Sequence, residues 1–484
     1  MNLAKIAANA ILAGLIAAIP VAARAGSHLK VRVHPRALSF KKLHAGVTSP
    51  AKVVTLSNRG ASAIQIWSIA ANGQFTSAND CGSSIAPGAS CRIWVQFVPA
   101  MARKIAGSQE KGKLIVSYSA PGDAQPVERR VALAGETFGT ASIYVANFGS
   151  ASVNEYPFGA TGDVSPTTII SGPGTGLANP FGVALDSTGN IYVANLNGGN
   201  SSPPGSVTVY PPGSSGDAAP LAAISGAATG LNYPWGIALD SSGNIYVANI
   251  GPCCAPECGE SITIYASGSN GNAAPIGIIP ADATTQINGT YGIVFDAAGR
   301  LWAANYGGGP SAIGSITAYA PGAWGDVAPV VNITGDTAGD SNAGLNGPAA
   351  VSLDPGGNIY VTNGLGANVT VYSAGSNGNV SPAMTIGGSN TGFSVSEMNI
   401  ALDYTGNFYV TNSQFGYDLA PPPLDLAEII SEAEGSPWWD DTTQGNILIF
   451  PPKSDGNAAP AASLDGSNTA LFQPWGYAIG PSAP

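Results

Sequence analysis

The chain has 484 residues, more than a single small hydrophobic core can organise, so more than one domain is expected. Gly (64) and Pro (37) make up about a fifth of the residues, which is below the level of disordered low-complexity chains. Charged residues are only 10%, so Ser, Thr, Asn and Gly must cover much of the surface. This composition suits an extracellular protein better than a cytosolic one.

The N-terminus has the features of a secretory signal peptide. Lys5 precedes an apolar run over residues 6–21, and Ala23 and Ala25 place small residues at both recognition positions of a cleavage site. An uncleaved anchor is disfavoured, because a Gly and a Pro interrupt a run that is already short for a bilayer. No second apolar run of about 20 residues follows, so no transmembrane segment is expected. Removal of residues 1–25 should leave a secreted protein, either extracellular, periplasmic or on the cell surface.

The charge is divided unevenly along the chain. Residues 26–139 carry 14 Lys or Arg against 5 Asp or Glu, a net of +9, and residues 140–484 carry 2 against 24, a net of −22. Such asymmetry indicates two modules with different partners, or modules that attract each other. Anionic cell-envelope polymers are a more plausible partner for the basic module of an exported protein than nucleic acid. Ordinary solvated charge is the alternative.

The segment from residue 26 to 139 is expected to be a small all-β sandwich. It contains alternating runs rich in β-branched residues and separated by turn residues. These runs are Ala51–Leu56, Ile64–Ile69, Cys91–Val98, Lys113–Tyr118 and Val127–Leu133. The segment resembles the Ig-like domains of the abnormal-spindle/hydin class, in motifs that lie at Leu38–Phe40, Val54–Gly60, Cys81–Pro99 and Leu133–Gly135. The resemblance implies a scaffold or adhesion module and carries over no catalytic residue.

Two cysteines lie in this segment. Export permits disulfides, so Cys81 and Cys91 are expected to form one across a short loop, which would contribute roughly 2–3 kcal/mol. A metal site built on the two thiols is the alternative. It is weakened because no His or second Cys pair lies nearby.

From residue 140 onward the sequence repeats itself. One motif, of the type Ile-Tyr-Val-Ala-Asn, occurs at Ile143–Asn147, Ile191–Asn195, Ile245–Asn249, Leu301–Asn305, Ile359–Asn363 and Phe408–Asn412. A second motif, Tyr-x5-Gly-[Asp/Asn]-x2-Pro, starts at Tyr156, Tyr210, Tyr265, Tyr319, Tyr372 and, with Phe, at Phe450. A fixed order of motifs at a regular period predicts a repeat architecture. Each repeat has four short strand signals joined by Gly-Asn or Gly-Asp turns.

The two ends of this region complement each other. The first Ile-Tyr-Val-Ala-Asn motif has no strand signal before it, and the strand signal at Pro474–Ile479 has no such motif after it. The C-terminal strand is therefore expected to complete the first repeat, giving a closed six-bladed β-propeller over residues 140–484. The pattern Pro-x-Gly-Val-Ala-Leu-Asp-x2-Gly-Asn-Ile-Tyr-Val-Ala-Asn resembles the NHL family of β-propellers. Many NHL copies end the second strand in Ala-Asp, whereas this chain has Asn in all six.

Two sets of residues are expected to converge at one face of the propeller. The first is a ring of amides, which we call the Asn ring: Asn147, Asn195, Asn249, Asn305, Asn363 and Asn412. The second set enters the first strands: Phe181, Trp235, Tyr291, Ala349, Met398 and Trp475. Amide oxygens could coordinate Ca²⁺ or bind a sugar, and an aromatic collar could stack on it. The alternative is structural, with Asn in Asx turns and aromatics packed between blades.

Composition argues against catalysis. All three His (His28, His34 and His44) precede the propeller, so a Ser-His-Asp or His-rich metal site on it is excluded. A His-free mechanism would need a carboxyl group at the channel mouth. The repeated carboxylates end the first strands on the opposite face and are interpreted as turn residues: Asp186, Asp240, Asp296, Asp354 and Asp403.

Two loops interrupt the repeats. One contains Cys253, Cys254 and Cys258, which could give one disulfide and a free thiol or, less persuasively, a metal site. The other is an acidic insertion over residues 413–444 in which Trp438 and Trp439 follow a possible short helix. Exposed Trp in such a loop suits a recognition surface. The alternative is a flap that covers the channel or docks onto the basic sandwich.

Together these features predict a secreted, non-catalytic binding protein that uses one propeller face and its inserted loops to bind an envelope or extracellular protein or glycan. The alternative is a Ca²⁺-dependent lactonase or lyase with a metal at the channel mouth, held by Asn and by carboxylates of the acidic insertion, since some six-bladed propellers are such enzymes. No other cofactor, no nucleic acid and a monomeric state are expected.

Overall fold

A computed structural model describes residues 29–44, 48–99, 108–138, 141–197, 205–251, 259–307, 314–335, 342–395, 397–403, 406–413 and 445–481. Within these ranges the fold is all-β, and the one helical element is the 3-10 turn η1 at Pro173–Thr175. No helix long and apolar enough to cross a membrane occurs in the described ranges. The predicted signal peptide, residues 1–25, lies outside them.

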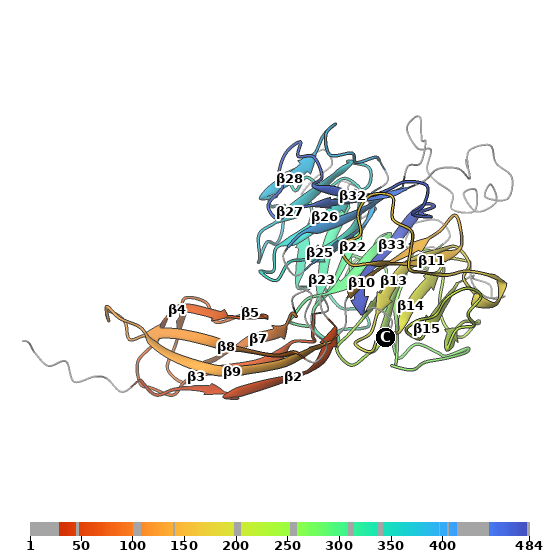
Figure 1. The fold of residues 1–484 in the computed structure, drawn as a ribbon. Coiled ribbons are helices and arrows are strands. Elements are labelled where there is room, and N and C mark those ends of the chain that lie inside the picture. The colour runs from red at the N-terminus through yellow and green to blue at the C-terminus, as the bar shows by residue number, and fades with distance from the viewer. Residues whose placement is uncertain are drawn as a thin grey trace, which may run out of the picture.

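The N-terminal strands form two sheets around one hydrophobic core (Figure 1). One sheet has the order β1-β3-β7-β5 and the other β2-β9-β8-β4-β6. The strands are β1 (Val31–His34), β2 (Ala37–His44), β3 (Lys52–Asn58), β4 (Ile64–Ala71), β5 (Phe75–Asn79), β6 (Ser84–Ile85), β7 (Ser90–Phe97), β8 (Ser108–Ser119) and β9 (Val127–Phe138). All five predicted strands are present, whereas β1, β2, β5 and β6 were not predicted as strands. Strand β2 pairs with β9 in parallel, which the alternation of residues could not indicate.

The later strands form six four-stranded antiparallel sheets within the described ranges, an arrangement consistent with a β-propeller. Sheet 1 is β33-β10-β11-β12, and sheets 2 to 6 follow in chain order as β13–β16, β17–β20, β21–β24, β25–β28 and β29–β32. The first strands are β33 (Pro474–Pro481), β13 (Pro180–Leu185), β17 (Pro234–Leu239), β21 (Thr290–Phe295), β25 (Pro348–Leu353) and β29 (Glu397–Leu402). The second strands, which carry the Asn motif, are β10 (Ala141–Asn147), β14 (Ile191–Asn195), β18 (Ile245–Asn249), β22 (Leu301–Asn305), β26 (Ile359–Asn363) and β30 (Phe408–Asn412).

The outer half of each sheet is formed by the third and fourth strands. The third strands are β11 (Ser152–Pro157), β15 (Ser206–Tyr210), β19 (Ser261–Tyr265), β23 (Ser315–Tyr319), β27 (Asn368–Tyr372) and β31 (Asn446–Phe450). The fourth strands are β12 (Thr168–Ile170), β16 (Ala222–Ile224), β20 (Gly277–Pro280), β24 (Val331–Ile333), β28 (Met384–Gly387) and β32 (Ala462–Leu464).

The C-terminal strand closes sheet 1, as the sequence predicts. Strand β33 pairs antiparallel with β10, and Ile143 is opposite Ile479 in the register. The first strands also contact one another in a closed cycle, from β33 through β13, β17, β21, β25 and β29 back to β33. Every first strand therefore has a neighbour on both faces, which agrees with the lack of polar alternation in its sequence.

The Gly of the second motif joins each sheet to the preceding one. Its backbone N–H donates to a carbonyl oxygen of the fourth strand of the preceding sheet at 2.6–2.9 Å, and all six sheets show this bond. The pairs are Gly162 with Ser463, Gly216 with Ile169, Gly271 with Ala223, Gly325 with Ile278, Gly378 with Asn332, and Gly456 with Thr385. The first pair links sheet 1 to sheet 6, so the ring is closed at its rim as well as by β33. Each bond also covers an edge that could otherwise pair with another chain.

The Tyr of the same motif fixes a loop within its own sheet. The Tyr210 hydroxyl donates to the carbonyl oxygen of Thr175 at 2.6 Å, and Tyr265 bonds Thr229 in the same way at 2.7 Å. Both rings are fully buried, and burial raises the pKa of Tyr210 to about 12, so the hydroxyl remains a donor at any physiological pH. These bonds hold the loop that enters the first strand.

Glycines let the first strands approach closely at the centre. An ideal Cβ on Gly182 would lie 2.5 Å from the carbonyl oxygen of Trp235 and 3.1 Å from Cγ2 of Ile237, both on the next first strand. Gly236, Gly292 and Gly476 meet the next first strand in the same manner. A side chain at these positions would have to push neighbouring backbones apart.

We predict that Gly182→Ala lowers the free energy of unfolding by about 1–3 kcal/mol, because the added methyl group meets a backbone oxygen that cannot move independently. Urea denaturation of the mature protein measures the change. Gly149→Ala is a matched control, since its Cβ would meet the flexible Gln473 side chain at 3.2 Å and the Phe472 carbonyl oxygen at an ordinary contact distance of 3.6 Å. It should change stability by less than about 0.5 kcal/mol. Equal effects in the two variants would contradict the close-packing account.

Candidate functional site

The Asn ring marks one face of the ring of sheets, which we call the Asn face. Each of the six Asn ends a second strand, and each is 0–1% exposed. The Asn-bearing strand ends therefore lie beneath the surface. The amide groups form hydrogen bonds within their own sheet.

Asn195 shows the hydrogen-bond pattern. Its Nδ2 donates to the Thr208 hydroxyl at 3.0 Å and to the Val193 carbonyl at 3.3 Å, and its Oδ1 accepts the backbone N–H of Ala178 at 3.2 Å. Thr208 lies on the third strand, and Ala178 lies in the loop that enters the first strand. The amide therefore ties three parts of one sheet together.

The other five Asn repeat this pattern with small changes. Their Oδ1 atoms accept from Phe472, Asn232, Asn346 and Ser394 backbone N–H groups and, for Asn305, from the Thr290 hydroxyl. Their Nδ2 atoms donate to side chains of the third strand, such as Thr263, Thr317 and Thr370. These contacts match the structural alternative for the ring. Direct ligand binding by the ring stays a prediction that none of these contacts supports.

Aromatic side chains line the centre of the Asn face. Phe181, Trp235 and Tyr291 come from successive first strands and pack in sequence. The first pair is tilted by 32° with ring centroids 3.7 Å apart, and the second pair is stacked at 4.5 Å. Trp475 meets Phe181 and Trp235 edge-on, at 4.5 and 5.2 Å. The structure therefore brings together the four aromatic residues of the predicted collar. Ala349 is buried beside them, and the side chain of Met398 lies outside the described part.

The collar includes residues that the sequence analysis did not single out. Tyr306 extends the stack beyond Tyr291, at a centroid distance of 4.8 Å and an interplanar angle of 17°. Phe148 packs edge-on against Phe181 at 5.1 Å, and Leu196 and Ile250 are buried in the same clusters. These four residues directly follow the Asn of their repeat. An apolar residue at that position was the signal that could have revealed them.

Below the collar, the first strands surround a cavity of about 290 Å³. Its described lining contains no Asp, Glu, His, Lys, Arg or Cys, and apart from Tyr and Trp only Ser352 and Asn399 contribute polar side chains. Asn399 stands where four other first strands have Gly. A cavity with this lining offers no carboxylate or imidazole for general acid–base chemistry.

The repeated Asp residues lie at the opposite ends of the first strands, and they are turn residues as predicted. The Asp186 carboxylate accepts backbone N–H bonds from Thr188 and Asn190, at 2.8 and 3.0 Å, and the Asn190 side chain at 2.8 Å. Burial opposes ionisation of Asp186, but these bonds outweigh it, so the pKa of its carboxyl lies below the ordinary value. We call this side the Asp face.

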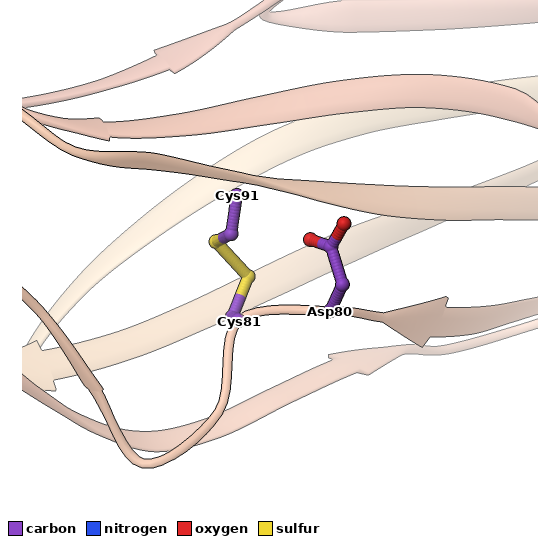
Figure 2. Close-up of side chains that lie close together, drawn as sticks. All are labelled: Asp80, Cys81 and Cys91. Carbon is purple, nitrogen blue, oxygen red and sulfur yellow. A yellow bond between two sulfur atoms is a disulfide. The ribbon is translucent and has the colours of Figure 1, made fainter. Parts of the chain in front are cut away.

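The predicted disulfide is present between Cys81 and Cys91 (Figure 2). The neighbouring Asp80 accepts the Arg92 backbone N–H at 2.6 Å and pairs with the Arg92 guanidinium at 3.2 Å. Asp80, Cys81 and Cys91 are the one group of three His, Cys, Asp or Glu side chains in the described ranges whose ligand atoms lie close enough together to hold a metal ion. Because both sulfurs are bonded to each other, the alternative of a thiolate metal site does not apply to this state.

Other predicted site residues lie outside the described ranges. They are Cys253, Cys254, Cys258, Trp438, Trp439 and the acidic insertion beyond Ser413. Their roles stay predictions.

Comparison with known protein families identifies one of the repeats and does not identify an activity. The NHL repeat model matches residues 231–254, which contain one first strand and one Asn motif. No curated protein matches the chain.

Three similar solved structures come from different classes. The periplasmic gluconolactonase PpgL of Pseudomonas aeruginosa is 14% identical, covers 70% of this chain and 99% of its own, and has a TM-score of 0.39. An inactive virginiamycin B lyase of Staphylococcus aureus, solved with quinupristin, is 10% identical over 79% of this chain and 95% of its own, with a TM-score of 0.30. An ASH/PapD-like domain of human CEP192 is 11% identical over 28% of this chain and 96% of its own, with a TM-score of 0.19. Values this low carry no argument about activity.

We predict that Asp186→Asn lowers the free energy of unfolding by about 1 kcal/mol at pH 7, because the variant loses the charge-assisted bonds of the turn. The folded pKa lies below the unfolded value of about 3.9, so the contribution is present above that pH and is lost as pH falls through the folded pKa. Urea denaturation at a series of pH values should therefore show the two proteins converging in acid.

Asp326→Asn is the control for this prediction. The Asp326 carboxylate is exposed and makes no hydrogen bond with another described residue, so its replacement should have little effect at any pH. A difference between wild type and Asp186→Asn that stays constant down to about pH 2 would contradict the account.

Proposed function

We propose that this is a secreted, non-catalytic binding protein built from an Ig-like sandwich over residues 26–139 and a six-bladed NHL-like propeller over residues 140–484. Two sheets around one core support the first module. The six repeat sheets, the closing strand β33 and the NHL repeat match support the second. The Asn face of the propeller is the proposed contact surface.

The observation that carries this proposal is the combination of an aromatic surface and an uncharged cavity. Trp235, Trp475, Tyr306 and Tyr233 are each only partly buried at the centre of the Asn face. Partly exposed aromatic residues of this kind form the anchors of many protein interfaces.

The partner is an extracellular or envelope protein or glycan. Phe181, Trp235, Tyr291 and Tyr306 form one series of rings with centroids 3.7–4.8 Å apart, so Trp235 and Tyr291 each have a neighbouring ring on both sides. A sugar needs an uncovered ring face for stacking, whereas an apolar protein side chain can pack against ring edges. The arrangement therefore favours a protein partner over a glycan. The signal sequence and the disulfide support an extracellular, periplasmic or cell-surface location.

The Ca²⁺-dependent lactonase or lyase is the less supported alternative. A metal at the channel mouth would have to reach the oxygens of the Asn ring, but these side chains are 0–1% exposed and each Oδ1 accepts a hydrogen bond from its own sheet. No carboxylate lines the described part of the cavity. Ca²⁺ takes six to eight oxygen ligands, and among the described residues neither the buried ring nor the cavity lining offers such a set; the carboxylates of the acidic insertion lie outside the described ranges.

We predict that Leu365→Asp on the Asn face weakens partner binding at least about tenfold, because it places a charge beside the apolar collar. Leu365 is 44% exposed, and both its side chain and that of Tyr306 lie about 3 Å from the Cβ position of Gly347. Immobilised mature protein would be tested against an isolated envelope-protein fraction and a glycan array.

Leu221→Asp is the matched control, since Leu221 is 64% exposed at the outer rim. It should bind the same ligand as wild type. Equal losses in both variants, or a loss only in Leu221→Asp, would contradict the assignment to the Asn face.

A further inference from the structure

Lys453 breaks the repeat at a position of defined backbone conformation. The residue three positions after the Tyr or Phe of the second motif is Gly in five of the six repeats. Each of these glycines has a positive φ, between 72 and 84°. They are Gly159, Gly213, Gly268, Gly322 and Gly375. In the last repeat the residue is Lys453, and it adopts the same conformation with a φ of 65°.

This substitution is unfavourable for the fold. A residue with a Cβ is strained in the left-handed region, where Gly is not. The five glycines show that the turn itself prefers Gly, so nothing in the repeat requires a side chain here. Strained backbone positions gather at functional sites, but seven other described non-Gly residues also have a positive φ, so the charge and surroundings of Lys453 carry the argument further.

Lys453 is also unusual in its charge. Residues 140–484 contain two cationic side chains, Arg300 and Lys453. Arg300 is paired with Asp296 at 2.6 Å, whereas Lys453 is exposed and makes no ion pair with a described residue. Among the described residues, Lys453 is therefore the one cation of this acidic module without an ion pair, and it occupies a strained turn.

The side chain lines a groove on the Asp face between sheets 5 and 6. The groove has a volume of about 470 Å³. Val371, Met384 and Pro452 give it an apolar floor, and Asp354, Ser373 and Lys453 add polar groups. It is distinct from the collar, which lies on the Asn face.

The polar groups define which ligand the groove suits. Lys453 offers a positive charge for an anion. The Asp354 oxygens each accept one bond from Asn358, at 2.9 and 2.7 Å, and a carboxylate oxygen can accept a second from a ligand hydroxyl. The exposed Ser373 hydroxyl can donate or accept. A simple anion would gain from Lys453 but meet repulsion from Asp354, whereas a ligand with hydroxyl groups would also gain from Asp354.

We propose that this groove binds a small polyhydroxy carboxylic acid of the sugar-acid type, with the carboxylate at Lys453 and hydroxyl groups at Asp354 and Ser373. The site is independent of partner binding on the Asn face.

The test measures the melting temperature of the mature protein with glucuronate, glucose or inorganic phosphate, each raised to about 20 mM. Glucuronate should raise the melting temperature saturably. Glucose, which lacks the charge, and phosphate, which lacks the carbon-bound hydroxyl groups, should give no saturable rise. A protein that does not respond to glucuronate, or responds equally to phosphate, would overturn the proposal.

Two variants separate binding from stability. Lys453→Gly restores the residue of the other repeats, so it should raise the melting temperature without ligand by about 1–2 °C and abolish the glucuronate response. Lys453→Met keeps the strain and removes the charge, so it should abolish the response without that rise.

Ala470→Gly is the control for strain relief alone, because Ala470 has a φ of 52° in a loop before β33. It should be stabilised and keep the full glucuronate response. A glucuronate response that survives in Lys453→Gly and Lys453→Met would show that another site binds the acid and would overturn the proposal.

Discussion

The buried amide at the end of each second strand is the interaction on which the ring of sheets depends. Asn249, for example, joins the third strand through Thr263 and the entry loop through the Asn232 backbone N–H. A buried polar group without a hydrogen-bond partner would lower the free energy of unfolding by about 1–3 kcal/mol. Removal of the amide would therefore leave its buried partners unsatisfied, and removal of a partner would do the same to the amide. Because Asn has both a donor and an acceptor, it can serve strand and loop together. Asp, which many NHL repeats carry here, would lack the donor when ionised.

This constraint also bears on the proposed binding function. Fixed entry loops deliver Phe181, Trp235 and Tyr291 to the centre of the Asn face, where they stack in a fixed order. A collar held in this way loses little side-chain freedom on binding, which favours affinity for a partner. The same hydrogen bonds occupy the amide oxygens that a metal would need. The hydrogen bonds of the buried Asn amides therefore both hold the collar in place and leave the amide oxygens poorly suited to bind Ca²⁺.

The repeat motifs made much of the fold predictable. The strand order within each sheet and the pairing of β33 with β10 follow from the spacing of the motifs. The contacts of the motif residues were not predictable, because a spacing does not show which atom a side chain reaches. The Gly of the second motif was interpreted as turn chemistry, but its N–H also binds the preceding sheet, as Gly216 binds Ile169.

Departures from the repeat were harder to interpret than the repeat itself. Where Ala350 and Asn399 replace the first-strand Gly, the facing second strands have Thr362 and Thr411 instead of Ala, and each hydroxyl accepts the backbone N–H of its partner. The sequence shows both changes, but only the structure shows that they compensate. Lys453 likewise looks like an ordinary turn residue until its φ is known.

Hydrogen exchange in the loop at residues 228–234 tests the role of the buried amides most directly. The account predicts slow exchange of the Asn232 amide in the wild-type protein. In Asn249→Ala, exchange in this loop should rise at least about tenfold, while the equivalent loop before β13 stays unchanged. Rapid exchange of this loop in the wild-type protein, or no difference between wild type and variant, would contradict the account.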